Sequence, residues 1–416
     1  MRRIAIVLAT AIAIIPSIRY LYELRYRWDP ALQHSVCRSL ACSDDLLLES
    51  AKTASQADQS KIPYVLANLA EAVRRNTVSP NLWCDLGQAM RQARRIEDAR
   101  YCYARAVELG PANAPVLWRT ALFYLRIKDK QNALKFMSQL LELVPEYKDL
   151  IFSIYAANIR DVSQTLEFGV PKQGRIAQEY FRYLLNNAAI DDVKRGWQGM
   201  AESHLVDRET AGTYVDFLIS RGEFASAAKI WPTATGNETA YFRTNLIYNG
   251  DFEMEPLQKG FDWKFHTSRS VRIRRVSEMA FSGSSSMEID FLGSENVEFN
   301  DFAQSVALAA GRYRFVAWIR TADLTTDQGI GFRLVDSSNP GGAVTTRILT
   351  GTHNWTPVEL FVEHSGATRL LRIELVRHAS WKFDNKIKGR VWIDNLSLTP
   401  LRSSPSATLP RQVSSN

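Results

Sequence analysis

The stretch "NLIYNGDFE" (residues 245–253) marks the point at which the sequence changes from a helical to a strand-like pattern. Residues before it place apolar side chains at helical spacing, whereas residues after it alternate apolar and polar side chains, as half-buried strands do. The stretch contains an Asn-Gly pair, and two carboxylates, Asp251 and Glu253, flank Phe252. It therefore predicts the first strand of a second domain and raises the question of what the carboxylates do there.

Short alternating segments continue from this stretch to the end of the domain. In "GRYRFVAWIR" (311–320), every second side chain from Tyr313 to Ile319 is apolar and shares one face. The same alternation occurs in "IGFRLVD" (330–336), "PVELFVEH" (357–364), "RLLRIELVRH" (369–378) and "GRVWIDNLSLTP" (389–400). Many short strands separated by turn signals indicate an antiparallel sandwich. We therefore expect residues 244–400 to form one β-sandwich of jelly-roll type.

Upstream, pairs of helices repeat. The segment "LWCDLGQAMRQARRIEDARYCYARAVELGP" (82–111) contains two apolar helix faces and ends at a proline. The first face holds Trp83, Leu86, Gly87 and Met90, and the second holds Ala99, Tyr103 and Ala106. The pattern recurs about 34 residues later, and a weaker copy occupies residues 208–231. This pattern resembles the tetratricopeptide repeat, so we expect an α-solenoid over 44–231 and a linker over 232–243.

The expected solenoid has a functional consequence. Each helix pair buries its apolar face only against its neighbours, so the stack leaves a long concave groove. Such a groove binds peptides or protein partners, and this is the role that we expect of residues 44–231. The alternative is a spacer that only carries the C-terminal domain away from a membrane.

The N-terminus predicts a membrane segment. Two arginines precede an unbroken apolar run from Ile4 to Ile15, and a helix continuing to Tyr22 reaches about 28 Å, close to the thickness of a bilayer core. Tyrosine and tryptophan residues follow the run, as they do at membrane interfaces. We therefore expect residues 1–28 to be an uncleaved anchor, with a cleaved signal peptide or a buried helix as alternatives. The expected location is the periplasmic face of a bacterial inner membrane.

The cysteine positions and the net charge give weaker evidence about the function than the N-terminal segment and the repeats do. Cys37 and Cys42 can close a small ring, whereas Cys84 and Cys102 fall on neighbouring predicted helices. An even number of cysteines is compatible with disulfides in an exported protein, and a small buried side chain is the alternative for the second pair. The formal net charge of +7 is spread along the chain without a basic stripe, so nucleic-acid binding is not expected.

The strand segments occur in the order of a known family. The stretches "NLIYNGDFE", "GFDWKF", "EMAFSGSSSMEI", "GRYRFVAWIR", "HNWTPVEL" and "VWIDNLSL" follow one another as in jelly-roll carbohydrate-binding modules of the group that includes families 4, 9 and 22. This resemblance covers residues 244–399. It implies a galactose-binding-like sandwich, often with a structural calcium ion, and it places Trp263, Trp355 and Trp392 in the core.

The resemblance places calcium ligands on the carboxylates of Glu253, Glu278 and Asp394, with the backbone carbonyls of Asp251 and Phe281 completing the site. Calcium prefers six to eight oxygen ligands from carboxylates and carbonyls. Three convergent carboxylates would repel one another without an ion. We therefore expect Ca2+ to tie the two ends of the sandwich together. The alternative is that Asp251 serves only the turn and Glu253 is a solvated charge.

The resemblance also implies a glycan site built from aromatic rings, which stack on sugars, and from planar polar side chains. Trp318 lies on the polar face of its strand, and Trp381 lies in the loop-like "HASWKFDNKIKG". Arg320, Arg333 and Glu374 lie on the polar faces of their strands. We expect these five residues to line the site, and a sandwich without glycan affinity is the alternative.

No stretch remains for a separate catalytic domain, and the sequence contains no GxSxG, HExxH, P-loop or GxGxxG motif. We therefore expect a non-catalytic, multidomain α + β protein that ends in a disordered Ser/Pro-rich tail over 401–416. Its expected role is bacterial exopolysaccharide assembly or export, with a protein partner in the groove and a polysaccharide on the sandwich. The alternatives are an adaptor without a glycan ligand and a glycan-active enzyme that uses the sandwich.

Overall fold

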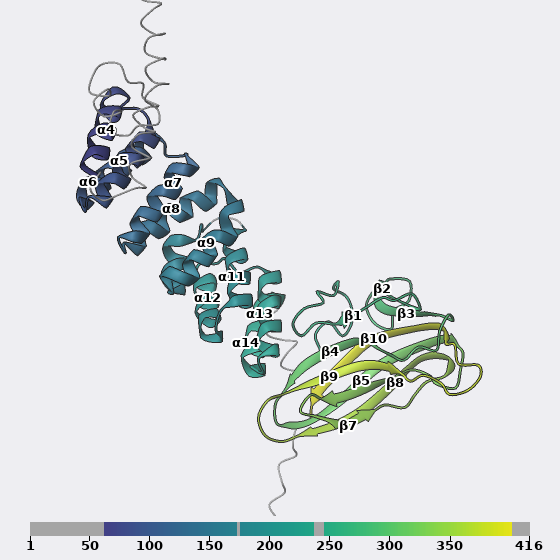
Figure 1. Cartoon of the computed structure of the whole chain (residues 1–416). Coiled ribbons are helices and arrows are strands. Elements are labelled where there is room, and N and C mark those ends of the chain that lie inside the picture. Colours follow the sequence, from purple (N-terminus) through teal and green to yellow (C-terminus); the bar gives the residue numbers. More distant parts are fainter. Residues whose placement is uncertain (1–61, 173–174, 237–244, 402–416) are drawn as a thin grey trace, which may run out of the picture. The chain divides into compact units, whose positions relative to one another are not determined.

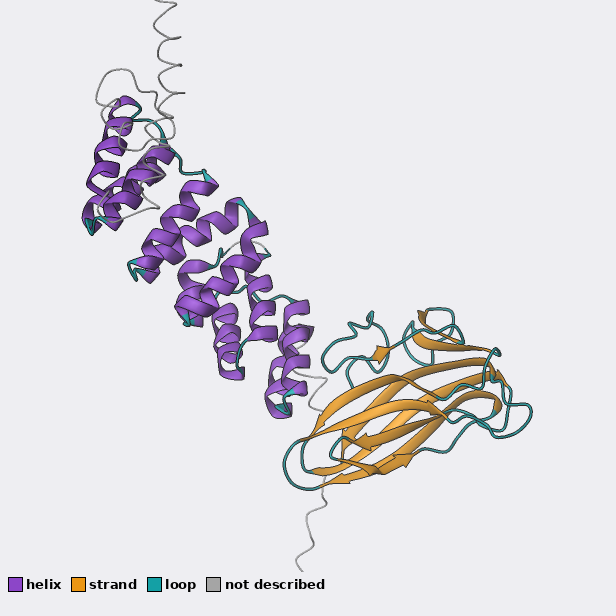
Figure 2. Cartoon of the chain, viewed as in Figure 1, coloured by secondary structure: helices purple, strands orange, loops and turns teal. Residues whose placement is uncertain are grey.

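A computed structural model of the 416-residue chain describes residues 62–172, 175–236 and 245–401 (Figure 1). The chain divides into two compact units, Met1–Leu205 and Val206–Asn416. Within the described ranges, the first unit is helical, and the second contains one helix pair and two β-sheets (Figure 2). The chain thus combines helical and antiparallel β structure, as the sequence predicts.

Several predicted features fall outside the described residues. These are the membrane anchor over 1–28, Cys37 and Cys42, most of the linker over 232–243, and the tail after Leu401. In the part of the chain that the structure covers, no helix combines the length and the hydrophobicity that a bilayer span needs.

The described part of the first unit consists of short helices, some of which begin at a capping side chain. They are α4 (Ile62–Arg75), α5 (Pro80–Gln92), α6 (Ile96–Leu109), α7 (Ala114–Arg126), α8 (Lys130–Leu143), α9 (Lys148–Ile154), α10 (Val162–Gln164), α11 (Ile176–Asn187) and α12 (Ile190–Glu202), with the 3-10 turn η2 (Pro145–Tyr147) and the π-helical turns η3 (Tyr155–Ile159) and η4 (Thr165–Gly169). Asn113 and Asp129 cap α7 and α8, because their side chains accept hydrogen bonds from first-turn N–H groups. Gly87 allows close packing, since a Cβ there would lie 3.0 Å from the ring of Tyr103.

The apolar faces predicted for the helix pairs are buried. Leu86, Ala99 and Ala106 are each at most 6% exposed. Cys84 and Cys102 are free and buried, and burial raises the pKa of both thiols to about 11. These two cysteines are therefore small core side chains. The helix pairs agree with the expectation, whereas membership in the tetratricopeptide family stays a prediction.

The second unit begins with a helix pair that packs on the first residues of the sandwich region. The pair consists of α13 (Arg208–Ser220) and α14 (Phe224–Thr235). Trp231 is fully buried, and its ring meets those of Tyr248 and Phe261 edge-on. Gly260 adopts a φ of +57°, and a Cβ there would lie 2.3 Å from Trp231. Pro232 lies in the last turn of α14, so the helix continues past the predicted boundary at 231.

Two five-stranded antiparallel sheets follow. The strands are β1 (Lys264–Phe265), β2 (Val271–Val276), β3 (Ser286–Leu292), β4 (Phe299–Leu308), β5 (Gly311–Leu324), β6 (Gly331–Asp336), β7 (Asn339–Thr345), β8 (Gly351–His364), β9 (Arg369–Arg377) and β10 (Lys388–Pro400). Their order is β1-β4-β9-β6-β7 in sheet A and β2-β3-β10-β5-β8 in sheet B. The last strand, β10, lies at the centre of sheet B, between β3 and β5. Strands from opposite ends of the region are therefore neighbours.

The sandwich core contains the inward side chains of both sheets, including the alternating positions of β5 from Phe315 to Ile319. Trp263 is fully buried there, as predicted. Trp392 is 4% exposed but lies outside the core cluster, opposite Arg320 on the outer face of sheet B, so its predicted core position is not confirmed. Trp355 is half-buried and lies outside the core cluster, so its predicted core position was wrong. The reason is the strand period of two, which sends Trp355 and Val358 to opposite faces of β8.

The first strand predicted for the sandwich is not a strand, because residues 245–253 form turns. The side chain of Asn245 accepts a hydrogen bond from the N–H group of Leu398. The side chain of Asn249 bonds both backbone groups of Met254. Asn245 Oδ1 also accepts a hydrogen bond from the N–H group of Ile247 at 3.0 Å. Local side-chain bonds such as those of Asn245 to Ile247 and of Asn249 to Met254 compete with a regular ladder. The segment therefore follows β10 through isolated hydrogen bonds and joins the core through its apolar residues.

Candidate functional site

Arg333 and Glu374, two of the five glycan candidates, lie opposite each other on the outer face of sheet A. Arg333 Nε donates to Glu374 Oε1 at 2.6 Å, and Arg372 Nε donates to Oε2 at 3.0 Å. The Glu374 side chain is only 4% exposed. Both oxygens of this carboxylate are therefore engaged by guanidinium groups, and the cluster is an internal ion network of the sheet.

Trp318 and Arg320 lie on β5, on the outer face of sheet B. Phe281 stacks on Trp318, with 3.9 Å between ring centroids and 15° between ring planes. Trp355 meets Phe281 edge-on at 5.8 Å, and Arg320 Nη1 donates to Asn354 Oδ1 at 2.5 Å. One face of the Trp318 indole is therefore already covered by protein.

The residues expected to bind calcium surround the loop that carries Phe281. Asp394 Oδ2 accepts hydrogen bonds from two backbone N–H groups of this loop, at 2.7 and 2.9 Å. Glu253 Oε1 accepts two more, also at 2.7 and 2.9 Å, and its Oε2 accepts the hydroxyl of Ser284 at 2.6 Å. Two carboxylates therefore fasten this loop: Glu253 ties it to the segment 245–253, and Asp394 ties it to β10.

This arrangement does not form a calcium cage. The oxygens of Glu253 and Asp394 accept N–H and O–H donors, and Glu278 is exposed. The hydrogen bonds from Ser284 lower the pKa of Glu253, whereas burial raises the pKa of Asp394. Across the described ranges, no group of three or more His, Cys, Asp or Glu side chains is placed to hold a metal ion. Calcium binding therefore stays a prediction.

Trp381, the fifth candidate, lies in the loop between β9 and β10, which we call the aromatic loop (residues 378–387). A second ring, Phe383, lies two residues further on. The relative exposures of the two side chains are 101% and 105%, so neither is covered by protein. Between them, Lys382 Nζ lies 3.4 Å from Asp327 Oδ2. Two exposed rings two residues apart in one loop make this loop a candidate interaction surface.

A buried arginine holds the aromatic loop. Arg377, at the end of β9, has no exposed surface. Its guanidinium donates to Asn296 Oδ1 at 2.9 Å, to the carbonyl oxygen of Val297, and to that of Asn385 at 3.1 Å. These acceptors belong to the loop before β4 and to the aromatic loop itself. Arg377 therefore joins two loops at one end of the sandwich.

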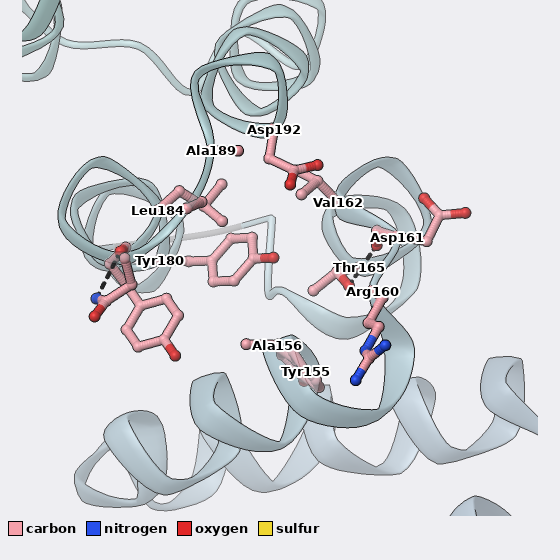
Figure 3. Close-up of a pocket in the computed structure, with 13 residues that line it drawn as sticks. Tyr155, Ala156, Arg160, Asp161, Val162, Thr165, Tyr180, Leu184, Ala189 and Asp192 are labelled. Carbon is pink, nitrogen blue, oxygen red and sulfur yellow. Dashed lines mark hydrogen bonds between the residues drawn. The ribbon is translucent and has the colours of Figure 1, made fainter.

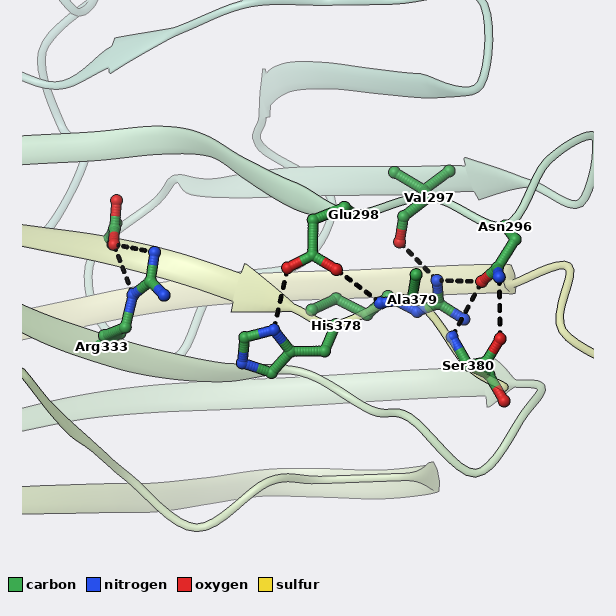
Figure 4. A network of polar contacts seen from close by, with 9 residues as sticks. Asn296, Val297, Glu298, Arg333, His378, Ala379 and Ser380 are labelled. Atoms are coloured by element: carbon green, nitrogen blue, oxygen red, sulfur yellow. Dashed lines mark hydrogen bonds and ion pairs between the residues drawn. The ribbon is translucent and has the colours of Figure 1, made fainter. Parts of the chain in front are cut away.

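Further hydrogen bonds fix the base of the same loop (Figure 4). Asn296 bonds both backbone groups of Ser380, at 2.8 and 2.9 Å. Ser380 Oγ donates to Asp327 Oδ1 at 2.5 Å. Glu298 accepts a hydrogen bond from the N–H group of Ala379 at 2.6 Å. The base is thus held by side chains from two other loops, while the two aromatic rings lie in solvent.

The five candidates therefore lie in three separate places. The sequence analysis selected Trp381 but missed Phe383 and Arg377. A signal for the arginine was present, because Arg377 continues the inward phase of β9 that runs from Leu371 to Leu375. An arginine in phase with a core needs acceptors for its donors, and nearby loops supply them here to Nη1 and Nη2, whereas the buried Nε has no partner in the described part of the chain.

No protein-family model matches the chain, and no curated protein matches it either. Several solved structures similar to part of the chain are carbohydrate-binding modules. TmCBM61 in complex with β-1,4-galactotriose is 19% identical, with a TM-score of 0.28, over 38% of this chain and 99% of that chain. The xylan-binding domain CBM22-1 of Paenibacillus barcinonensis Xyn10C is 13% identical (TM-score 0.26; 37% and 94% covered), and a family 16 carbohydrate-binding module is 21% identical (TM-score 0.27; 37% and 99% covered).

Proposed function

We propose that this protein binds a polysaccharide and that Trp381 and Phe383 form its stacking surface. The observation that supports the proposal is the full exposure of both rings on a loop whose base is fixed by a buried arginine. Removing apolar surface from water is favourable by about 25 cal/mol per Å2. Two uncovered rings therefore gain free energy from a ligand that covers them.

The chemistry of the aromatic loop fits a sugar. An aromatic ring presents a flat apolar face with a negative quadrupole, which complements the C–H groups on the face of a pyranose. Lys382 and Asp384, next to the rings in the chain, supply a donor and an acceptor for sugar hydroxyls. Because the base of the loop is already ordered, binding requires little further loss of conformational freedom.

The remaining parts of the proposal concern the whole chain. We propose a non-catalytic role, in keeping with a sequence that contains no GxSxG, HExxH, P-loop or GxGxxG motif. The helix pairs then bind a protein partner, and residues 1–28 anchor the chain in a bacterial envelope membrane. Exopolysaccharide assembly or export is the process in which these parts work together.

Affinity electrophoresis of the full chain through gels containing soluble neutral and acidic polysaccharides tests the proposal. We expect at least one polysaccharide to retard the protein, and the double variant Trp381→Ala/Phe383→Ala to migrate as it does without polysaccharide. Phe361→Ala is the matched control, since Phe361 is an exposed ring (61%) on β8, away from the aromatic loop. A folded chain that no polysaccharide retards, or a double variant retarded like the wild type, contradicts the proposal.

The same gels, run with calcium and with a chelator, test the predicted ion. A structural calcium held by Glu253, Glu278 and Asp394 predicts that the chelator lowers the retardation in the gels and the melting temperature in a parallel thermal unfolding experiment. An unchanged melting temperature would show that hydrogen bonds alone fasten the loop that carries Phe281.

A further inference from the structure

Within the second unit, the α13–α14 helix pair packs on a short segment that precedes β1, residues 255–263, which we call the clasp. The ring of Phe261 in the clasp meets that of Trp231 in α14 edge-on. The N–H group of Gly260 donates to Asp216 Oδ1 of α13 at 3.1 Å. The clasp therefore contacts both helices of the pair.

A buried carboxylate lies in the clasp. Asp262 follows Phe261, which contacts the helix pair, and precedes Trp263, which belongs to the sandwich core. It has no exposed surface. Its Oδ2 accepts a hydrogen bond from the N–H group of Leu257 at 2.6 Å, and its Oδ1 accepts one from that of Trp263 at 2.7 Å. Burial disfavours the charged form of such a group, because it removes the charge from water.

Carboxylates of the helical unit are placed differently. Two of them, Asp161 and Asp192, line a cavity of about 310 Å3 (Figure 3). Asp192 pairs with Arg195 at 2.6 Å, and its side chain is 36% exposed. Asp161 is exposed and caps a helix by accepting the N–H group of Gln164 at 3.0 Å. Among the described residues, Asp262 has neither an ion pair nor contact with solvent.

Burial raises the pKa of Asp262 to about 6, although its two hydrogen bonds and the charge of Arg208 on α13 lower it. Arg208 itself donates to the hydroxyl of Tyr248 at 3.4 Å. Two further acids of α13 pair with lysines, and α14 contributes the uncharged Trp231. The charged and titratable groups around the clasp are thus Arg208, Glu209 and Asp216 of α13, Tyr248 of the segment 245–253, Lys259 of the clasp and Lys264 of β1.

We infer that the packing of the helix pair on the clasp is a pH-sensitive junction, which is tighter when Asp262 is protonated than when it is charged. When the junction opens, water reaches Asp262 and its pKa returns to the ordinary value of 3.8. Between that value and about pH 6, the closed junction therefore binds a proton that the open junction does not. Protonation favours the closed state below pH 3.8, and this contribution is lost as pH rises through about 6.

A second buried polar group weakens the same junction. The indole Nε1 of Trp231 is buried and has no hydrogen-bond partner among the described residues. A buried donor without an acceptor costs free energy, which is recovered when water reaches it. The packing is nevertheless close, because a Cβ at Gly260 would lie 2.3 Å from the Trp231 ring. The junction is therefore well packed but contains two polar groups that gain hydration when it opens.

Hydrogen–deuterium exchange of the full chain between about pH 4 and about pH 8, read by mass spectrometry, tests the inference. After correction for the intrinsic exchange rate, peptides covering the clasp report the opening constant of the junction, and peptides covering β5 report that of the sandwich core. We expect the opening constant of the clasp to rise about 100-fold from about pH 4 to about pH 7, since the acidity constants of Asp262 in the open and closed states differ by about that factor. The rise should be much smaller in β5. A clasp whose opening constant does not rise with pH overturns the inference.

Two variants assign the titration to Asp262. Asp262→Asn can still accept the N–H group of Leu257 but carries no charge, so its opening constant should not change with pH. Arg208→Gln keeps the carboxylate and removes the nearby cation, so the rise should extend to higher pH than in the wild type. Arg221→Gln, at the exposed end of α13, is the matched control and should follow the wild type. If Asp262→Asn keeps the wild-type pH dependence, or Arg208→Gln behaves like Arg221→Gln, another group controls the junction and the inference is wrong.

Discussion

Trp318 and Trp381 are alike in the sequence, since neither occupies the inward phase of a strand, yet the fold gives them different surroundings. Trp318 lies under Phe281 at a stacking distance of 3.9 Å, whereas Trp381 is fully exposed. The covering ring belongs to a loop fastened by Glu253 and Asp394. A tryptophan on a sheet face is thus available to a ligand only if no distant loop lies over it.

The two regions also differ in what their polar groups do. Around Trp318, carboxylates hold a loop down on the sheet. Around Trp381, the guanidinium of Arg377 and the amide of Asn296 hold the base of a loop whose tip stays uncovered. Side-chain hydrogen bonds therefore fasten a loop in both places, but the fastened loop covers a tryptophan on sheet B and leaves Trp381 uncovered at the other site.

The largest effect should come from Arg377→Met, which keeps the volume of the side chain but removes its donors. The carbonyl oxygens of Val297 and Asn385 then lose a donor, and each such loss costs about 1–3 kcal/mol. Asn296 Oδ1 keeps the N–H group of Ser380. We expect the free energy of unfolding to fall by about 3 kcal/mol in urea titrations. Arg369→Met, on the exposed part of the same strand, is the control. A loss below about 1 kcal/mol would mean that Arg377 does not hold the aromatic loop.

The next-largest effect concerns Trp381, the exposed member of the tryptophan pair compared above. Trp381→Ala removes a ring that touches no other part of the sandwich, so the melting temperature should stay unchanged. Polysaccharide affinity should fall by about 30-fold, which corresponds to about 2 kcal/mol, the size of a binding hot spot. Calorimetry against the polysaccharide selected in the gels checks the affinity.

Trp318→Ala should show the opposite pattern. The variant loses the stacking with Phe281, so we expect a destabilisation of about 1–2 kcal/mol. Polysaccharide affinity should remain within about twofold of the wild type. Thermal unfolding together with the same calorimetry separates the two quantities. A stable variant that has lost its affinity would place the sugar on sheet B instead.

The smallest effect concerns pH. Hydrogen bonds from Ser284 lower the pKa of Glu253 from 4.5, so its charged form stabilises the fold above that pH. This contribution is lost as pH falls through the folded-state pKa. Burial raises the pKa of Asp394, so its protonation acts with the opposite sign. Glu253→Gln should therefore reduce the loss of stability below pH 4.5, measured by urea titration, and Glu278→Gln should not.

Much of the fold could be predicted because strand alternation is a local property. The inward positions of β5 and the burial of Trp263 follow from sequence spacing and family resemblance. The segment 245–253 could not be predicted as turns, because the side chains of Asn245 and Asn249 take hydrogen bonds that a strand would give to its neighbour. The polar side chains of this segment therefore favour turns over a strand, although its apolar pattern fits both structures.

The candidate site was less predictable because its contacts join residues far apart in the chain. Phe281 over Trp318, and Asn296 beneath the aromatic loop, depend on where loops meet after folding. Periodicity identifies which face of a strand a residue occupies, but it does not say what covers that face. Phe383 was missed for this reason, although it lies two residues from a selected tryptophan.

The most direct test of the account is calorimetry of the full chain, Trp381→Ala and Trp318→Ala against the same polysaccharide on the same day. The account predicts binding by the wild type and by Trp318→Ala, and a loss of about 30-fold in Trp381→Ala. Equal affinities of the wild type and Trp381→Ala would contradict it, because the exposed aromatic loop would then take no part in binding.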